Sequence, residues 1–344
     1  AEVYPLGILE GGHEVIRDNM KRTLAFAFAL FFCFACGTAF AQEQTGEDGA
    51  PRIDRYTQVF DRSGDEGKLV ARFLKLCLAE DSGTDEKSGD STILTSPDGK
   101  VMLIDGGAPD CADQVEGYLE ALGIAKIDLV VASHPHIDHI GSLSRILAKF
   151  PVATLCMSKV VYPTGSYTSL LSAAAKRNVK IVFLESGSEF EFGNSVKVKV
   201  YNPEPNIAYY DGYPANSTQF INNKSLVMKF FFGESTMLFM GDLYTSGEVG
   251  LIEKFGAELQ ADVIKVGHHG SETSSSKSFV KLVAPKVAVM MHDNLASLQV
   301  YKNYRKVGAM AYVTCIDGSV KVAGDAAKNW TVLTQFDRLS DFLN

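Results

Sequence analysis

The sequence is poor in the features that define several classes of protein. Its 344 residues include six cysteines, too few and too scattered for a disulfide scaffold or a zinc-finger protein. It lacks an excess of positive charge, and its formal net charge of −8 disfavours attraction of the whole molecule to nucleic acid or an anionic membrane. Hydrophobic residues make up 46% and charged residues 22%, which excludes collagen-like, disordered and mucin-like chains. The composition predicts a globular protein with one large domain or two ordinary ones.

An apolar run near the start of the chain predicts export. Lys21 and Arg22 precede an apolar stretch over 24–35, and Ala39-Phe40-Ala41 places small residues before Gln42. This is the pattern of a cleaved signal peptide, and the apolar run is too short for a transmembrane anchor. A lipoprotein signal is disfavoured because the cysteines of this segment lack the usual preceding residues. We therefore expect a periplasmic or extracellular protein without stable membrane insertion.

The remaining sequence suggests a simple domain plan. We expect residues 1–19 to be an upstream, non-native segment, residues 20–41 the signal peptide and residues 42–66 a polar linker. One folded domain should span 67–336, followed by a short tail over 337–344. Four cysteines follow the predicted cleavage point, and their pairing is left open: Cys77, Cys111, Cys156 and Cys315.

Apolar runs and turn signals predict more strands than helices. The turn Ser96-Pro97-Asp98-Gly99 predicts a hairpin. Strands are expected over 69–78, 91–95, 100–104, 128–132, near 160, 179–183, 196–201, 226–232, 237–240, 263–266 and 287–291. Helices are expected over 111–122, 142–150 and 246–255, between the strands near 160 and 179, and from 278. Polar side chains follow several strands, which favours an α/β fold of helix-covered sheets with a site along one edge.

The strongest chemical signal is Ser133-His134-Pro135-His136-Ile137-Asp138-His139, directly after a buried strand. Imidazole and carboxylate groups are ligands that divalent zinc, manganese and iron prefer. Several such groups this close together repel one another once they are charged, so a cation stabilises them. A polar surface loop is the alternative interpretation, and the density of ligand residues disfavours it.

Two later strand ends extend this pattern. Gly241-Asp242 follows one apolar strand, and Gly267-His268-His269-Gly270-Ser271 follows the next. Either motif alone is a weak signal. Together, in this order after HxHxDH, they indicate one metal site assembled from three parts of the chain.

With these motifs the chain resembles the metallo-β-lactamase-fold hydrolases. More narrowly, it resembles the hydrolase domain of the competence protein ComEC and its free-standing secreted relatives. The similar motifs are Gly89-Asp90-Ser91, LIDGG at 103–107, SHPHIDHIGSL at 133–143, NNKSLV at 222–227, the GD of 241–242 and KVGHHGS at 265–271. The resemblance implies an αββα sandwich, two mixed β-sheets flanked by helices.

The resemblance also implies two divalent metal ions, with zinc favoured over manganese or iron. It assigns His134 and His136 to the first ion, Asp138 and His139 to the second, and Asp242 to both. His269 is favoured as a further ligand of the second ion and His268 as a catalytic, substrate-facing group, although the reverse assignment stays open. Asp90 and Asp105 would orient ligand histidines or solvent.

The sequence departs from this pattern in three places. Many enzymes of the fold supply a mid-chain histidine to the first ion, and none lies between His139 and His268. The Asn222/Asn223 region occupies that place, so water or an amide oxygen could fill the position. The late His-Pro of ComEC-like domains is replaced by His292-Asp293-Asn294, and their QGD is SGD here.

The favoured function is a secreted hydrolase that uses a metal-bound hydroxide, oriented by Asp138 or Asp242, on nucleic-acid or cell-envelope phosphodiesters. The alternatives are hydrolysis of a β-lactam, lactone or thioester, and a non-enzymatic metal-stabilised binding protein. His268, Ser271 and Asn223 are the expected substrate contacts, and Ser271 has a capping role as its alternative. No protein partner is indicated.

Two further segments carry open alternatives. The basic segment 265–306 could receive a phosphate backbone or form a solvated helix face. The aromatic loop 209–213 could stack a base, bind a quaternary ammonium group or pack in the core.

Overall fold

A computed structural model describes residues 54–78, 87–207 and 216–338. The upstream segment, the predicted signal peptide and the start of the linker lie outside the described residues, as does the aromatic loop at 209–213. Within the described ranges, none of the helices has the length and apolarity that crossing a bilayer requires.

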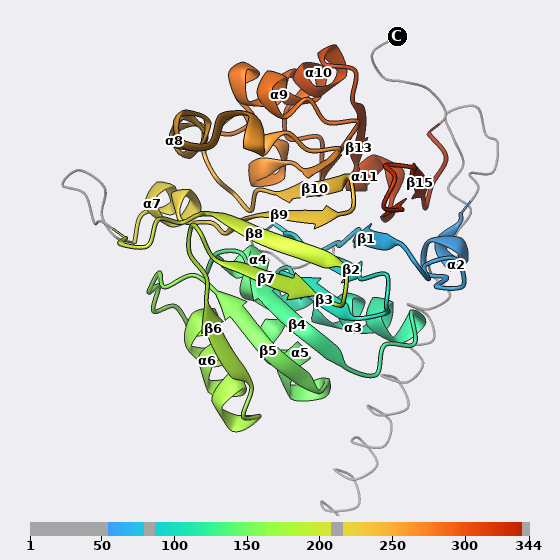
Figure 1. The fold of residues 1–344 in the computed structure, drawn as a ribbon. Coiled ribbons are helices and arrows are strands. Elements are labelled where there is room, and N and C mark those ends of the chain that lie inside the picture. Colours follow the sequence, from blue (N-terminus) through green and yellow to red (C-terminus); the bar gives the residue numbers. More distant parts are fainter. Residues whose placement is uncertain (1–53, 79–86, 208–215, 339–344) are drawn as a thin grey trace, which may run out of the picture. The chain divides into compact units, whose positions relative to one another are not determined.

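Two mixed β-sheets form the centre of the domain (Figure 1). The first has the order β15-β14-β1-β2-β3-β4-β5-β6, and the second β13-β12-β11-β10-β9-β8-β7. The first sheet contains β1 (Leu69–Phe73), β2 (Thr92–Thr95), β3 (Val101–Ile104), β4 (Ile127–Ala132), β5 (Val152–Met157), β6 (Lys180–Phe183), β14 (Val320–Gly324) and β15 (Trp330–Thr334). The second contains β7 (Glu189–Phe192), β8 (Val196–Asn202), β9 (Val227–Phe232), β10 (Ser235–Phe239), β11 (Val263–Lys265), β12 (Val287–Met290) and β13 (Met310–Val313).

Helices cover the outer face of each sheet. α3 (Ala112–Ala121), α5 (Leu143–Lys149) and α6 (Gly165–Lys176) share a buried core with the first sheet. α8 (Thr245–Phe255), α9 (Lys277–Val283) and α10 (Leu298–Lys306) share another with the second. The short helices are α2 (Tyr56–Val59), α4 (Ile137–Ile140), α7 (Thr218–Asn223) and α11 (Thr314–Asp317).

The core between the sheets is apolar from both sides. Phe73 and Met102 of the first sheet meet Phe230 and Phe239 of the second, and all four are buried. Each such side chain contributes roughly 1.5–3 kcal/mol relative to an exposed position. The expected αββα sandwich is confirmed, and so is the hairpin, because β2 and β3 pair antiparallel across Ser96–Gly99.

The sequence located the buried strands better than the edge strands. The strand expected near 160 is β5 at Val152–Met157, and the strand expected to reach residue 78 ends at Phe73. The sequence did not predict β7, β13, β14, β15, α7 or α10. Most residues of the edge strand β15 are only half-buried, so its sequence needs no continuous apolar run.

The expected domain boundaries need correction at both ends. Residues 55–66 were expected in the linker, but the Nε of buried Arg72 donates to the Val59 carbonyl oxygen at 2.7 Å and its Nη1 lies 2.8 Å from Asp65 Oδ2. At the other end, the Arg338 guanidinium pairs with Asp317. The folded domain therefore includes residues 55–66 and 337–338.

The four cysteines after the predicted cleavage point are free thiols. Cys111 and Cys156 are buried, Cys315 is half-buried and Cys77 is exposed. Burial raises the pKa of Cys111 to about 12, which keeps its thiol protonated and unreactive.

Candidate metal centre

The HxHxDH motif follows the buried strand β4 and runs into the short helix α4, which contains Asp138 and His139. The backbone of Gly89 packs against this motif, and the Asp90 N–H donates to the Asp138 carbonyl oxygen at 3.1 Å. A Cβ at Gly89 would lie 1.6 Å from that oxygen, and Gly89 has a φ of +77°. Only glycine fits this position, so the Gly89-Asp90 pair fixes the loop that carries the histidines.

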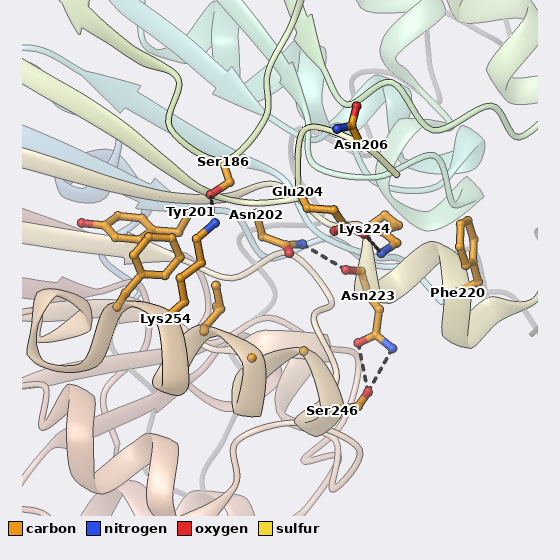
Figure 2. A pocket seen from close by; sticks show the side chains of 14 residues that line it. Ser186, Tyr201, Asn202, Glu204, Asn206, Phe220, Asn223, Lys224, Ser246 and Lys254 are labelled. Carbon is orange, nitrogen blue, oxygen red and sulfur yellow. Dashed lines mark hydrogen bonds and ion pairs between the residues drawn. The ribbon is translucent and has the colours of Figure 1, made fainter. Parts of the chain in front are cut away.

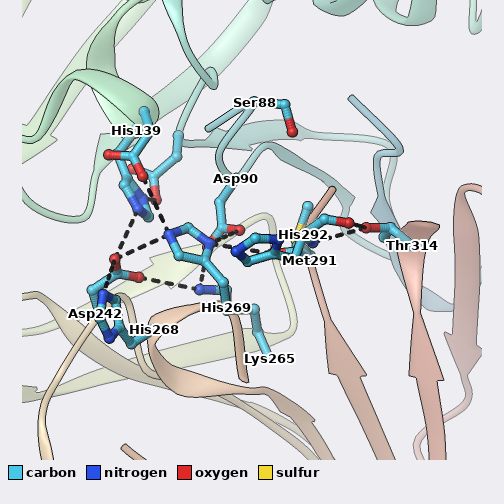
Figure 3. Close-up of polar contacts among 12 residues, drawn as sticks. Ser88, Asp90, His139, Asp242, Lys265, His268, His269, Met291, His292 and Thr314 are labelled. Carbon is cyan, nitrogen blue, oxygen red and sulfur yellow. Dashed lines mark hydrogen bonds and ion pairs between the residues drawn. The ribbon is translucent and has the colours of Figure 1, made fainter. Parts of the chain in front are cut away.

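The side chains expected around the second ion converge on one carboxylate oxygen. Asp242 Oδ2 lies 3.2 Å from His139 Nε2 and 3.2 Å from His269 Nε2 (Figure 3). His269 Nε2 also lies 3.3 Å from Asp138 Oδ2. Both Nε2 atoms are buried and make no hydrogen bond to the described residues. These four ligand-type groups, two carboxylates and two imidazoles with unused Nε2 atoms, fit a divalent ion.

The side chains expected around the first ion lie next to this group. His134 Nε2 is 3.0 Å from His136 Nδ1 and 3.8 Å from Asp242 Oδ2. Asn222 lies in the same cavity as His136, and its amide is buried without a hydrogen-bond partner among the described residues. Its position agrees with an amide in place of the absent mid-chain histidine.

Two carboxylates orient the histidines of the second group. Asp105 Oδ2 lies 2.9 Å from His139 Nδ1, and the same carboxylate accepts hydrogen bonds from the N–H and hydroxyl of Ser133. Asp90 Oδ1 lies 3.0 Å from His269 Nδ1. Each contact holds an imidazole with its Nε2 toward Asp242, the orienting role expected for both aspartates.

Asp90 also lies close enough to be considered as a ligand. One ligand-type atom each of Asp90, His139, Asp242 and His269 falls within 4.8 Å of the others. However, Asp90 contacts the far nitrogen of His269, and its other oxygen pairs with Lys265. These contacts favour the orienting role over direct ligation.

A buried lysine that the sequence did not single out anchors the centre. Lys265, at the end of β11, is 4% exposed, and its Nζ donates to the Gly241 carbonyl oxygen at 3.0 Å. The same Nζ pairs with Asp90 and lies 3.7 Å from Asp242 Oδ1. The lysine therefore supplies a fixed positive charge on the side of Asp242 away from the histidines.

Charges shift the proton equilibria of the two groups in opposite directions. Burial opposes the charged form of His139, but Asp242, Asp105 and Asp138 raise its pKa to about 10. Burial likewise opposes the charge on His269, and Asp242 and Asp90 raise its pKa well above the usual value. Burial and the neighbouring His139 lower the pKa of His134 well below the usual value. Without metal, the second group therefore holds protons that the first does not.

His268 and His269 face different neighbours. His269 is buried among the aspartates, whereas His268 lines the cavity, with its Nε2 3.9 Å from Asp242 Oδ2. His268 Nδ1 contacts the hydroxyl of Thr273, which in turn donates to Ser271 Oγ at 3.2 Å. The arrangement agrees with His269 as ligand and His268 as substrate-facing, and it places Ser271 against Thr273. No sequence motif predicted a role for Thr273.

The structure does not bring Asn223 to the centre. Its side-chain amide donates to Ser246 Oγ at 3.0 Å, and it lines a separate pocket of about 470 Å³ beside α8 (Figure 2). Its neighbour Asn222 lines the metal-side cavity instead. Of the two asparagines, the structure thus places Asn222 rather than Asn223 at the metal-side cavity.

The late His292-Asp293 segment also borders the centre. The His292 ring centroid is 5.6 Å from that of His269. Asp293 Oδ2 accepts a hydrogen bond from the Ser88 N–H at 2.8 Å, which fixes the segment before Asp90. In the basic segment 265–306, Lys265 is buried in the centre, while most of the other cations lie on the outer helices α9 and α10.

An open cavity of about 480 Å³ reaches the metal-side groups. This volume lies in the range of small-ligand pockets. His136, Asp138, Asp242, His268 and Asn222 line it together with Lys87, Ile137, Tyr162, Thr164, Gly165, Ser166 and Thr218.

Comparison with known proteins gives one family match and several relatives. Residues 84–201 match the model of the Metallo-beta-lactamase superfamily. The chain is 27% identical to ComE operon protein 3 of Bacillus subtilis over 239 residues, which cover 63% of this chain and 29% of the relative. It is 28% identical to competence protein ComA of Neisseria gonorrhoeae over 199 residues, 58% of this chain and 25% of the relative. The matched region thus spans less than a third of either relative.

The metallo-beta-lactamase fold protein YhfI of Bacillus subtilis superposes with a TM-score of 0.44 and 14% identity. The superposition covers 78% of this chain and 99% of that protein.

Proposed function

The chain carries a metallo-beta-lactamase domain, and from that premise we propose that it is an exported hydrolase of phosphodiesters that works with two divalent ions. The observation that carries the proposal is the convergence of His139 and His269, at 3.2 Å each, on one oxygen of Asp242. Both nitrogen atoms are buried and otherwise unused, which costs stability unless a ligand satisfies them.

The residues divide into two sets of ligands. His134 and His136, with Asn222 beside them, would hold the first ion, and Asp138, His139 and His269 the second. Asp242 would contact both. Bound divalent ions lower the pKa of water toward neutrality and stabilise charge that develops on a phosphoryl oxygen.

The other residues of the cavity bind and orient. Asp138 and Asp242 accept hydrogen bonds and so can orient a water molecule for attack. Burial lowers the pKa of His268 to about 4, so its imidazole is neutral at pH 7 and offers an uncharged hydrogen-bonding group to the substrate. Thr218 adds a hydroxyl group, which suits a phosphate better than an apolar acyl chain.

A paired assay tests the reaction class. Metal-free protein is reconstituted with zinc, manganese or iron and offered bis-p-nitrophenyl phosphate and a chromogenic β-lactam. We expect turnover of the phosphodiester only, and none by Asp138→Ala prepared in the same way. If the protein hydrolyses the β-lactam but not the phosphodiester, the proposal is wrong and the protein is a carbonyl hydrolase.

Export is tested separately. The charged start at Lys21-Arg22, the apolar stretch and Ala39-Phe40-Ala41 support cleavage before Gln42. N-terminal sequencing of the protein from a fractionated bacterial host should give Gln42 outside the cytoplasm. Recovery of intact residues 20–41 on a cytoplasmic protein would contradict it.

A further inference from the structure

The cavity has a polar wall that the metal-side groups do not use. This wall contains Lys87 and the first residues of α6, Gly165 and Ser166, together with Thr164 just before them. None of these residues was singled out as a ligand or catalytic group. The wall and the metal-side groups share one cavity, so a single substrate can contact both.

The backbone next to Lys87 is held in place, while the Lys87 side chain is exposed. The next residue, Ser88, is 1% exposed and donates its N–H to Asp293 Oδ2 at 2.8 Å. Lys87 and His268 line the same cavity. Lys87 is therefore a cation in the same cavity as the substrate-facing histidine, and the backbone next to it is held in place.

The start of α6 adds backbone donors. Thr164 caps this 12-residue helix, and its hydroxyl accepts a hydrogen bond from the Tyr167 N–H at 3.3 Å. The first N–H groups of a helix have no partner within it and attract anions. At Gly165 there is no side chain to cover the backbone.

Asn222, at the metal-side end of this cavity, has unused polar atoms that face the same space. It is 1% exposed, and neither its amide nitrogen nor its amide oxygen has a hydrogen-bond partner among the described residues. A buried amide that lines an open cavity without partners is costly unless a ligand or solvent satisfies it. The cavity thus has more capacity for polar contacts than the chain itself satisfies.

We propose that Lys87 and the N-terminal turn of α6 bind a second phosphate, adjacent in the substrate chain to the phosphate at the metal-side groups. The inference rests on the proposed phosphodiesterase function. It specifies the substrate class as a chain with at least two successive phosphodiesters, in preference to an isolated diester. A nucleic-acid strand and a glycerol phosphate polymer share this chemistry.

Kinetics on substrates with one and two phosphodiesters test the subsite. For Lys87→Ala, we expect KM for a thymidine trinucleotide to rise about tenfold, the loss expected for one charge-assisted hydrogen bond. KM for bis-p-nitrophenyl phosphate should change less than about twofold, because that substrate has one phosphate. Lys176→Ala removes the same charge from the exposed far end of α6 and is the matched control. A trimer of glycerol phosphate in place of the trinucleotide distinguishes the two sources.

A second pair of variants tests the helix terminus without weakening the helix. Ser166→Glu places a negative charge at the start of α6, where it favours the helix but repels an anion. Ser172→Glu places it at an exposed site further along the same helix. We expect only Ser166→Glu to raise KM for the trinucleotide, again about tenfold.

Binding separates failure of the subsite from failure of the proposed function. Anisotropy of a labelled trinucleotide on the metal-loaded protein needs no turnover, and Lys87→Ala should reduce the salt slope of binding by about 0.7. If the parent binds in this way but hydrolyses neither substrate, the subsite stands and the proposed function falls. If Lys87→Ala changes neither binding nor KM, or changes both substrates equally, the subsite is overturned.

Discussion

The two halves of the metal centre differ in how firmly the protein holds them. In the half around the second ion, Asp105 lies 2.9 Å from the far nitrogen of His139, and Asp90 lies 3.0 Å from that of His269. In the other half, His134 Nδ1 meets the hydroxyl of Ser133 at 3.1 Å, and the His134 and His136 rings meet each other.

This difference teaches how affinity is distributed between the halves. A carboxylate behind an imidazole fixes its orientation and increases its basicity, so the half around His139 and His269 is preorganised. In the other half, His136 lines the open cavity together with Asn222. We therefore expect the second ion to bind tightly and the first to exchange more readily.

The largest effect should come from the residue that both halves share. Asp242→Ala removes the carboxylate that lies 3.2 Å from both His139 and His269 and 3.8 Å from His134. We expect loss of both ions, measured by metal analysis after dialysis, and phosphodiester turnover below detection. Asp110→Ala, an exposed aspartate outside the centre, is the control. Retention of both ions by Asp242→Ala would mean that the halves do not share this ligand.

The two adjacent histidines should separate ligation from substrate contact. His269→Ala removes a buried group of the second half, so we expect loss of one ion and of activity. His268→Ala removes a cavity-lining group, so both ions should remain while the rate falls on the order of 10²–10³-fold, as for loss of an oxyanion donor. Metal content and bis-p-nitrophenyl phosphate turnover of both variants decide this. Loss of metal from His268→Ala instead would reverse the assignment.

The carboxylates behind the histidines should have a smaller effect, confined to one half. Asp105→Asn and Asp90→Asn keep the side-chain shape but remove the charge behind His139 or His269. We expect the affinity for the second ion to fall about 10–100-fold, with little change for the first. Competition with a chelator measures the two affinities. Equal weakening of both ions would refute the difference in preorganisation.

Much of the centre could be predicted because its ligands follow strand ends. HxHxDH follows β4, Asp242 follows β10 and the histidine pair follows β11, and the fold brings these ends together. The contact between Asp90 and His269 joins residues 179 positions apart, so the role of Asp90 could be expected only from a family resemblance.

The residues that were missed or misplaced have physical explanations. Asn222 and Asn223 end the short helix α7, and successive helical residues point about 100° apart, so a one-residue error selects a different pocket. Lys265 ends the apolar strand β11. The sequence pattern of that strand does not show that the lysine is buried and paired with Asp90. Thr273 acts only through His268, so its role depends on the fold of the loop.

The smallest expected difference between the halves concerns protons. Despite burial, neighbouring aspartates raise the pKa of His139 to about 10, so without metal it is protonated at pH 7.5. Burial lowers the pKa values of His134 and His136, so both are neutral there. A metal ion must displace protons only when it binds the second half. The affinity of this half for metal should therefore rise about tenfold per pH unit for each proton released. The affinity of the second half for metal should keep rising until the pH reaches the His139 pKa of about 10. The affinity of the first half should stay flat above pH 7.

Calorimetric titration of metal-free protein in two buffers of different ionisation enthalpy counts the protons that each ion releases. Equal proton release by both ions would show that the aspartates do not distinguish the two halves.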